Sequence, residues 1–394
     1  MVATRAARRV SATQSAGAAR FDPEELLTAR DRAWISDVYA DGVPDPGRVT
    51  PEQLAAMNPR DRERYRLQRT RYLRMVPLLE TSVVNDVMGQ LRLIANSAIR
   101  SDLHQQDVPI VNGEPGVGKT MMLKTHAAEE MIRLALHRSI DLEDGVAEPV
   151  ATFRPVIYAH LKSTSTQYDV VRLMCDELGW PSDRNPQRAF ERAIAQCGVQ
   201  LVIIDEIQHV NFDGRTGRHV HNIIRWMSNF GLRVILGGTD ADRVLNGGGT
   251  PAVEVAARNS RGRWIRVDVP KLEIDGRRQR ADWVDLIYSF ETRLRLTRSP
   301  QQEGWLADTF GEYMWARTQG YMNALVLLIN LAAAKAIETG AETIDRKTLD
   351  SIKLEDEVER QRAQRMAKFE ADNPAPEHAD RDGEWPDPQN RRAS

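Results

Sequence analysis

Apolar positions change their spacing along the chain, and this change divides the sequence into three regions. Between residues 21 and 100 they recur every three to four residues, which is typical of helices. Between residues 101 and 270, short β-branched runs alternate with helical patterns. Between residues 271 and 370 the spacing is helical again, and no run resembles a strand. We therefore expect a helical N-terminal region, an α/β core, and a helical lid with further C-terminal helices.

Five apolar runs in the central region are the candidate strands. They cover residues 108–113, 153–161, 199–207, 232–239 and 263–270. Runs of this kind, separated by helical patterns, indicate a parallel sheet with helices on its faces. The predicted fold class is therefore α/β: a three-layer domain on a parallel five-stranded sheet, preceded by helices and followed by a small helical lid domain.

The composition, 41% apolar and 28% charged, is that of a globular protein. No apolar run approaches the ~20 residues that span a bilayer, and the first residues lack the apolar core of a secretory signal. Cys175 and Cys197 lie in helical patterns, as expected of reduced, buried thiols. These features predict a cytoplasmic protein without a membrane partner. Residues 1–20, rich in Ala and Arg, and residues 371–394, rich in Pro and charge, are predicted to be disordered tails.

Basic residues are distributed unevenly between lysine and arginine. Only eight of the 54 are lysine, and the first lysine in the chain is Lys119. Each lysine is therefore more informative than each arginine. The net charge of −2 argues neither for nor against binding of nucleic acid. Evidence for such binding therefore has to come from local basic patches.

The clearest chemical motif is a glycine-rich loop after the first candidate strand. It matches G-x-x-x-x-G-K-[ST] in full and consists of Gly113, Glu114, Pro115, Gly116, Val117, Gly118, Lys119 and Thr120. Glycines let successive backbone N–H groups point at phosphate oxygens. Lys119 supplies charge to the β- and γ-phosphates, and the Thr120 hydroxyl can ligate Mg²⁺. With a helix from Met121 to about His137 behind it, the loop predicts binding of ATP and Mg²⁺.

Two acids end the third candidate strand. Residues 201–204 are all apolar, which predicts a strand buried on both faces, and Asp205 and Glu206 follow at its carboxyl edge. In this arrangement Asp205 holds Mg²⁺ through water, and Glu206 polarises the water that attacks the γ-phosphate. The glutamate favours hydrolysis over binding alone.

Thr239 ends the fourth candidate strand. If that strand lies between the first and the third, Thr239 reaches the γ-phosphate or the attacking water. Alternatively, the Gly-Thr turn caps the helix that follows, and Thr239 and Asp240 could divide the two roles.

Three arginines, Arg258, Arg261 and Arg263, precede the last candidate strand. In P-loop ATPases that form rings or filaments, an arginine at this place reaches the nucleotide of the neighbouring subunit. Arg263 is the first choice and Arg261 the second. A solvated surface arginine remains the alternative for each of them.

These motifs together resemble those of AAA+ ATPases over about residues 80–345. More narrowly, the chain resembles the TniB/TnsC branch of transposition-associated ATPases. The residues that carry this resemblance are 205–210 (DEIQHV), 235–245 (ILGGTDADRVL), 262–272 (GRWIRVDVPKL) and the closing helix within 318–340.

The resemblance implies ATP and Mg²⁺ at the P-loop, Asp205 and Glu206, with Thr239 as sensor and Arg263 as a trans-acting finger. It also implies a homo-oligomeric ring or filament, double-stranded DNA as a partner, and a transposase that the protein regulates or recruits in target selection. One departure concerns the lid, where many AAA+ proteins place an arginine that touches the γ-phosphate. The matching turn here is Gly320–Asn323, and Asn323 could contribute a weaker hydrogen bond.

The segment Arg60–Arg74 has seven arginines against two acids and contains two tyrosines. On a helix, Tyr65, Tyr72 and Val76 share one face, and arginines surround the rest. Two interpretations stay open: an element that binds DNA or a protein partner, and a docking helix with a solvated arginine face. Further candidate DNA contacts are Lys162, Arg215, Arg218 and His219.

Two other functions remain open. One is a helicase-loader-like ATPase that acts on a replication protein, and the other is a nucleotide-controlled signalling or defence switch without DNA binding. Stimulation by double-stranded DNA, by single-stranded DNA alone, or by neither separates these functions.

Overall fold

The computed structural model describes residues 21–97, 107–150, 152–162, 166–181, 185–209, 222–228, 230–239, 241, 264–300, 302–360 and 362–372. The predicted tail at residues 1–20 and nearly all of the predicted tail at residues 371–394 lie outside this description.

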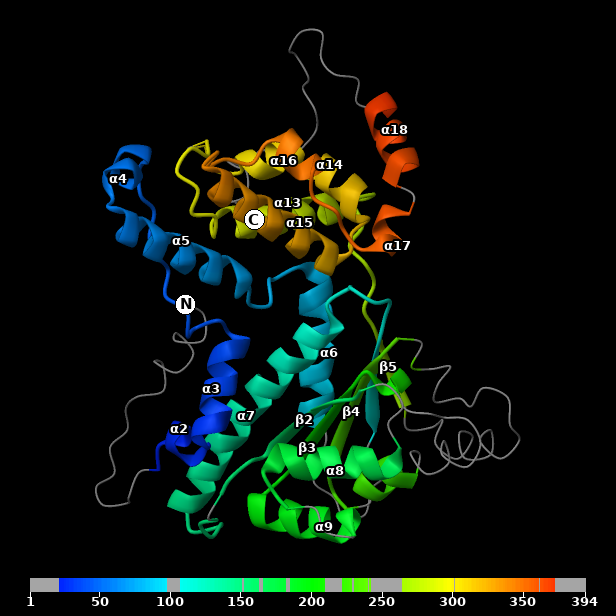
Figure 1. The fold of residues 1–394 in the computed structure, drawn as a ribbon. Helices are drawn as coiled ribbons and strands as arrows, with labels where there is room; N and C mark the ends of the chain where they lie inside the picture. The colour runs from blue at the N-terminus through cyan, green and yellow to red at the C-terminus, as the bar shows by residue number, and fades with distance from the viewer. Residues whose placement is uncertain are drawn as a thin grey trace.

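A five-stranded parallel sheet forms the centre of the molecule (Figure 1). Its strands are β1 (Val108–Asn112), β2 (Val156–His160), β3 (Leu201–Asp205), β4 (Arg233–Gly238) and β5 (Trp264–Asp268). Their order across the sheet is β2-β3-β4-β1-β5, and every neighbouring pair is parallel. This confirms the predicted α/β fold class, with a P-loop sheet of the AAA+ type.

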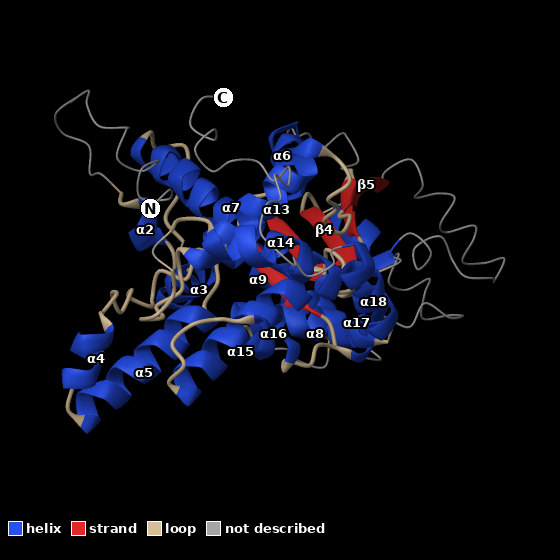
Figure 2. Cartoon of the chain, turned by 90° about the horizontal axis from the view of Figure 1, so that it is seen from above, coloured by secondary structure: helices blue, strands red, loops and turns tan. Residues whose placement is uncertain are grey.

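Both faces of the sheet are covered by helices, and Figure 2 shows the strands enclosed between them. The covering helices are α6 (Ser82–Ser97), α7 (Lys119–Glu143), α8 (Gln167–Leu178) and α9 (Pro186–Cys197). Successive side chains of a strand point to opposite faces. Val202 and Ile204 of β3 accordingly pack with α8 and α9, whereas Leu201 and Ile203 pack with α6 and α7. The domain therefore has three layers. Helix α7 is longer than the sequence predicts, because it begins two residues earlier, at Lys119 within the P-loop, and ends about six residues later, at Glu143.

The lid that follows the sheet consists of helices joined by loops, and its described residues form no strand. Its helices are α13 (Arg277–Glu291), α14 (Trp305–Thr318), α15 (Met322–Thr339), α16 (Arg346–Asp350), α17 (Asp356–Glu359) and α18 (Arg362–Asp372). Trp283 at its centre is 1% exposed. By length and composition α15 would suffice to cross a membrane, which the sequence analysis did not anticipate. Its Leu325 and Leu328 are fully buried in the lid, so we interpret α15 as a core helix.

The N-terminal helices contact two different parts of the molecule. These are α2 (Pro23–Leu26), α3 (Ala29–Val38), α4 (Pro51–Ala56) and α5 (Pro59–Arg74). In Figure 1, α2 and α3 lie along α7 of the core, whereas α4 and α5 lie beside the lid. We call residues 23–74 the N-terminal strap, because this segment spans from the core to the lid.

A buried ion pair anchors each end of the strap. Asp31 pairs with Arg154 at 2.8 Å on the core side, with side chains 3% and 10% exposed. Arg69 of α5 pairs with Glu342 at 2.7 Å on the lid side, with side chains 3% and 5% exposed. Buried charges carry a desolvation cost of several kcal/mol each unless they are paired and hydrogen-bonded. These two pairs therefore fix where the strap can attach.

The burial of Arg69 corrects one sequence expectation. The helical spacing predicted that Tyr65, Tyr72 and Val76 share one face of this helix and that arginines surround the rest. The inward face contains Arg69 as well as Tyr65 and Leu73, and Val76 lies beyond the end of the helix at Arg74. The Arg69 guanidinium stacks 4.6 Å from the centre of the Tyr65 ring, so the arginine packs as well as pairs.

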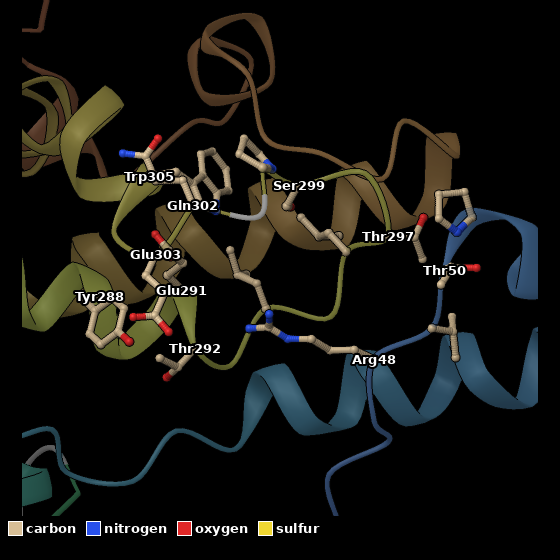
Figure 3. A pocket seen from close by; sticks show the side chains of 15 residues that line it. Arg48, Thr50, Tyr288, Glu291, Thr292, Thr297, Ser299, Gln302, Glu303 and Trp305 are labelled. Atoms are coloured by element: carbon tan, nitrogen blue, oxygen red, sulfur yellow. The ribbon is translucent and has the colours of Figure 1, made fainter.

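A pocket of about 300 Å³ lies between the strap and the lid (Figure 3). Arg48 and Thr50 of the strap line one side, and Glu291 and Trp305 of the lid line the other. The Glu291 carboxylate accepts hydrogen bonds from the backbone N–H groups at the start of α14, although its burial raises its pKa. The pocket belongs to the interface between strap and lid and includes no residue of the P-loop.

Loss of the Arg69 side-chain charge should destabilise the fold. We expect Arg69→Met to lower the free energy of unfolding by about 3–5 kcal/mol, because the Glu342 carboxylate stays buried without its partner. Arg64→Met, on the exposed face of the same helix, is the matched control and should change it by less than about 0.5 kcal/mol. Urea denaturation followed by circular dichroism measures both. Equal, small effects would contradict an anchoring role for the buried pair.

Candidate functional site

The P-loop connects the end of β1 to the start of α7. Gly116 and Gly118 have φ angles of 80° and 101°, which side-chain-bearing residues rarely adopt. Gly113 has a steric reason to be glycine, since a Cβ there would lie 2.5 Å from the Val269 carbonyl oxygen. The loop can therefore keep this conformation only with glycine at these positions.

Lys119 is held inside the loop by the loop's own backbone. Its side chain is almost completely buried, and its Nζ donates to the carbonyl oxygens of Gly113 and Glu114 at 2.8 and 2.7 Å. Burial lowers the pKa of Lys119, and the carboxylates of Glu206 and Asp205 oppose this shift. The ammonium is thus fixed in the centre of the cradle, where the sequence analysis placed a phosphate-binding charge.

Asp205 connects the third strand to the P-loop. It is fully buried, and its Oδ2 accepts from the Thr120 hydroxyl at 2.8 Å and from the Tyr158 hydroxyl at 2.7 Å. Burial, followed by the Asp205 charge, raises the pKa of Tyr158, so this phenol remains a donor. A hydroxyl beside a carboxylate is the hard oxygen set that suits Mg²⁺. The residues present therefore fit the predicted metal, and the structure brings Thr120 and Asp205 together.

Glu206 has a constrained backbone and a constrained side chain. Its φ angle is 61°, in the left-handed region that is uncommon for a residue other than glycine. Its carboxylate accepts a hydrogen bond from the Gln208 side-chain amide. The Gln208 Oε1 in turn accepts from the Thr239 backbone N–H at 3.1 Å. Gln208 therefore joins the strand-end glutamate to the end of β4.

Gly238 makes room for this connection. A Cβ at Gly238 would lie 2.5 Å from Gln208 Oε1. Neither Gln208 nor Tyr158 was among the predicted site residues. The position of Gln208, two residues after Glu206, was a local signal that it could contact the glutamate. No sequence pattern near Asp205 indicates that Tyr158 contacts it.

Thr239 follows β4, which lies between β1 and β3 as its predicted sensor role requires. Its hydroxyl oxygen is 3.4 Å from Lys119 Nζ. The alternative capping role concerns Asp240 and the helix after it, which, apart from Ala241, lie outside the described residues.

The lid contacts the P-loop directly through the start of α15. The Asn323 backbone N–H donates to the Gly116 carbonyl at 2.9 Å, and the Tyr321 hydroxyl donates to the Glu114 carboxylate. The Asn323 side-chain amide donates instead to Glu355 at 2.6 Å. The turn at Gly320–Asn323, where many AAA+ proteins have an arginine, is thus hydrogen-bonded to the backbone of the P-loop.

Several predicted residues lie outside the part of the chain that the structure describes. They are Arg258, Arg261 and Arg263, proposed as trans-acting, and Arg215, Arg218 and His219, proposed as DNA contacts. Lys162, the remaining candidate DNA contact, is exposed after β2.

The fold and the site together define a P-loop nucleotide-binding protein with the AAA+ fold. Residues 101–243, which contain the P-loop, Asp205, Glu206 and Thr239, match the family model described as an AAA domain. No curated protein sequence gives a significant match.

The solved structures to which this chain is similar include three that follow. The ORC1 protein of Aeropyrum pernix, solved in complex with DNA, has 14% identity and a TM-score of 0.49, covering 77% of this chain and 70% of that one. The ORC2 protein of the same organism, in its ADP form, has 15% identity and a TM-score of 0.48, covering 68% of each chain. The RuvB Holliday junction branch migration motor of Thermotoga maritima has 13% identity and a TM-score of 0.37, covering 67% of this chain and 66% of that one.

Removal of the Lys119 charge should abolish nucleotide binding. Lys119→Ala deletes the only side-chain cation of the loop, so we expect no saturable binding of a fluorescent ATP analogue. Lys335→Ala, on the exposed side of α15, is the matched control and should bind as the wild type does. Unchanged affinity in Lys119→Ala would place the nucleotide elsewhere.

Proposed function

We propose that this protein is an Mg²⁺-dependent ATPase that oligomerises on duplex DNA and regulates or recruits a transposase. The observation that carries the ATPase part is the convergence of three strand ends. Lys119 and Thr120 follow β1, Asp205 and Glu206 stand at the end of β3, and Thr239 follows β4, so these residues lie at one edge of the sheet. The carboxyl edge of a parallel sheet is where such folds bind their ligands.

Thr120 and Asp205 would hold the metal ion in this proposal. When bound, Mg²⁺ offsets the negative charge on the phosphate oxygens during hydrolysis. The protein's part is to keep its two ligands in place. Tyr158 and the Glu206 backbone N–H, which donates to Asp205 Oδ1 at 2.9 Å, fix both oxygens of the Asp205 carboxylate.

Glu206 would accept a proton from the attacking water, with Gln208 as its positioning residue. The amide of Gln208 restrains the carboxylate, and the Thr239 N–H restrains the amide. A general base contributes about 10²–10⁴-fold to a rate when it is correctly oriented. Lys119 and the Thr239 hydroxyl lie side by side and would face the same phosphate.

The assembly and transposition parts of the proposal are supported by the resemblance of the motifs to the TniB/TnsC branch. Arg263 is the proposed residue that reaches the nucleotide of the neighbouring subunit, where an arginine stabilises negative charge in the transition state. Such a site needs two subunits for full activity, which links hydrolysis to assembly.

The roles of Glu206 and Gln208 predict different kinetic effects. Glu206→Gln should bind ATP with unchanged affinity and lose at least about 100-fold in kcat, since the base is gone. Gln208→Ala should lower kcat by a smaller factor with KM unchanged, because the base remains but is less restrained. Steady-state phosphate release and nucleotide-binding titrations measure these effects. Normal turnover by Glu206→Gln would refute its role as the base, and a Gln208→Ala effect on KM alone would refute positioning.

Duplex DNA should stimulate both hydrolysis and assembly. We expect saturating duplex DNA with ATP to raise the hydrolysis rate and to produce rings or filaments visible by electron microscopy and light scattering. Arg263→Ala should lower hydrolysis in these assemblies without changing the nucleotide affinity of the monomer. Stimulation by single-stranded DNA alone would favour a helicase-loader-like ATPase, and no response to either DNA would favour a signalling switch.

A further inference from the structure

Helix α5 divides its seven arginines between structural contacts and one exposed groove. Three have partners within the protein. Arg69 is buried against Glu342, and Arg66 pairs with Glu63 at 2.6 Å. Arg62 donates to the carbonyl oxygens of Ala55 and Met57. The Arg69 pair holds α5 on the lid, the Arg62 hydrogen bonds close its turn with α4, and the Arg66 pair lies within α5.

The other four arginines lie on a single stripe. Arg60, Arg64, Arg71 and Arg74 are spaced by four, seven and three residues, which places them along one face of a helix with 3.6 residues per turn. Arg69 and Tyr65, on the lid-facing side, are about half a turn away from this stripe. All four arginines are exposed, and within the described ranges no side chain among them has an ion pair or a hydrogen bond.

The stripe forms one wall of a groove of about 920 Å³. The opposite wall comes from the end of α3 and the following turn, with Asp37, Gly42 and Val43. Leu67, 56% exposed, lies between Arg64 and Arg71. The groove is therefore strongly cationic.

We propose that this groove binds the phosphate backbone of duplex DNA. The inference rests on the proposed function, since it names the surface by which the protein would meet that DNA. Two carboxylates line the groove, and one of them, on Glu63, is already paired with Arg66. A guanidinium group can donate two parallel hydrogen bonds to phosphate oxygens. An arginine without a carboxylate partner can do so without first breaking an ion pair.

The lining of the groove favours a duplex over a single strand. Surfaces that bind single strands combine positive charge with aromatic side chains on which bases stack. No aromatic residue lines this groove. From Arg60 to Arg74 the helix rises about 21 Å, a length over which a duplex carries roughly 12 phosphates. Each of the four arginines can therefore contact a phosphate without contacting any base.

Helix α5, which forms one wall of the groove, is connected to the P-loop through contacts with the lid. Helix α5 is attached to the lid through Arg69 and Glu342, and the lid is attached to the P-loop through the Asn323 N–H and the Gly116 carbonyl. DNA in the groove would thus contact an element that is joined to the nucleotide cradle by two successive contacts.

The test compares two pairs of charge-removing substitutions at exposed arginines. Arg64→Gln with Arg71→Gln removes two charges from the groove, and Arg277→Gln with Arg278→Gln removes two from the start of α13, outside the groove. Binding of a labelled duplex is measured by fluorescence anisotropy over a range of salt concentrations. For the groove variant we expect at least about a 10-fold loss of affinity, and a slope of log K against log salt that is shallower by about two, since each phosphate contact contributes about 0.9. The control variant should keep the slope of the wild type.

Three results would overturn the proposal. If the wild type binds duplex DNA and the groove variant keeps its affinity and slope, the DNA lies elsewhere, and the proposed function survives. If the groove variant loses binding of polyglutamate instead of duplex, the groove receives an acidic protein. If the wild type binds no duplex at all, the proposed DNA function fails together with the groove. ATP hydrolysis without DNA and the urea midpoint should be the same in all three proteins, which separates loss of binding from loss of fold.

Discussion

The burial of the Asp205 carboxylate is the constraint on which the site depends. A charge at the end of a central strand has no access to water, so it has to be satisfied by hydrogen bonds from the protein. Its donors come from three places: Thr120 after β1, Tyr158 on β2, and the backbone of Glu206. Because β2, β3 and β1 are separate parts of the sheet, this single carboxylate ties the P-loop to the strand ends beside it.

The lid and the strap extend this arrangement beyond the sheet. The start of α15 bonds to the P-loop, and the far side of the lid holds α5 through a buried ion pair. At its other end the strap contacts α7, which begins at the P-loop, through α2 and α3. The core, the lid and the strap therefore each contact the other two.

Motifs that are local in sequence could be predicted, whereas long-range pairings could not. Short sequence patterns predict the five strands and the P-loop. The proximity of Thr239 to the P-loop could be predicted once β4 was assumed to lie between β1 and β3. Gln208 had a local spacing signal that was not used. The inward position of Arg69 depends on Glu342, 273 residues away, and no periodicity on α5 distinguishes it from the other six arginines. Tyr158 likewise acquires its role only because β2 and β3 pair in a register that sets Tyr158 opposite Ile203 and His160 opposite Asp205.

The way Lys119 is held has a consequence for how tightly the loop can bind. The Lys119 ammonium has three N–H donors, and two of them already donate to the carbonyl oxygens of Gly113 and Glu114. A phosphate that accepts more than one hydrogen bond from Lys119 therefore exchanges hydrogen bonds and does not simply add them. Such exchanges contribute only about 0.5–1.5 kcal/mol net. The loop, however, is ordered by these same bonds during folding, and ordering costs about 1–2 kcal/mol per residue. Preorganisation, more than the number of contacts, then sets the affinity of the cradle.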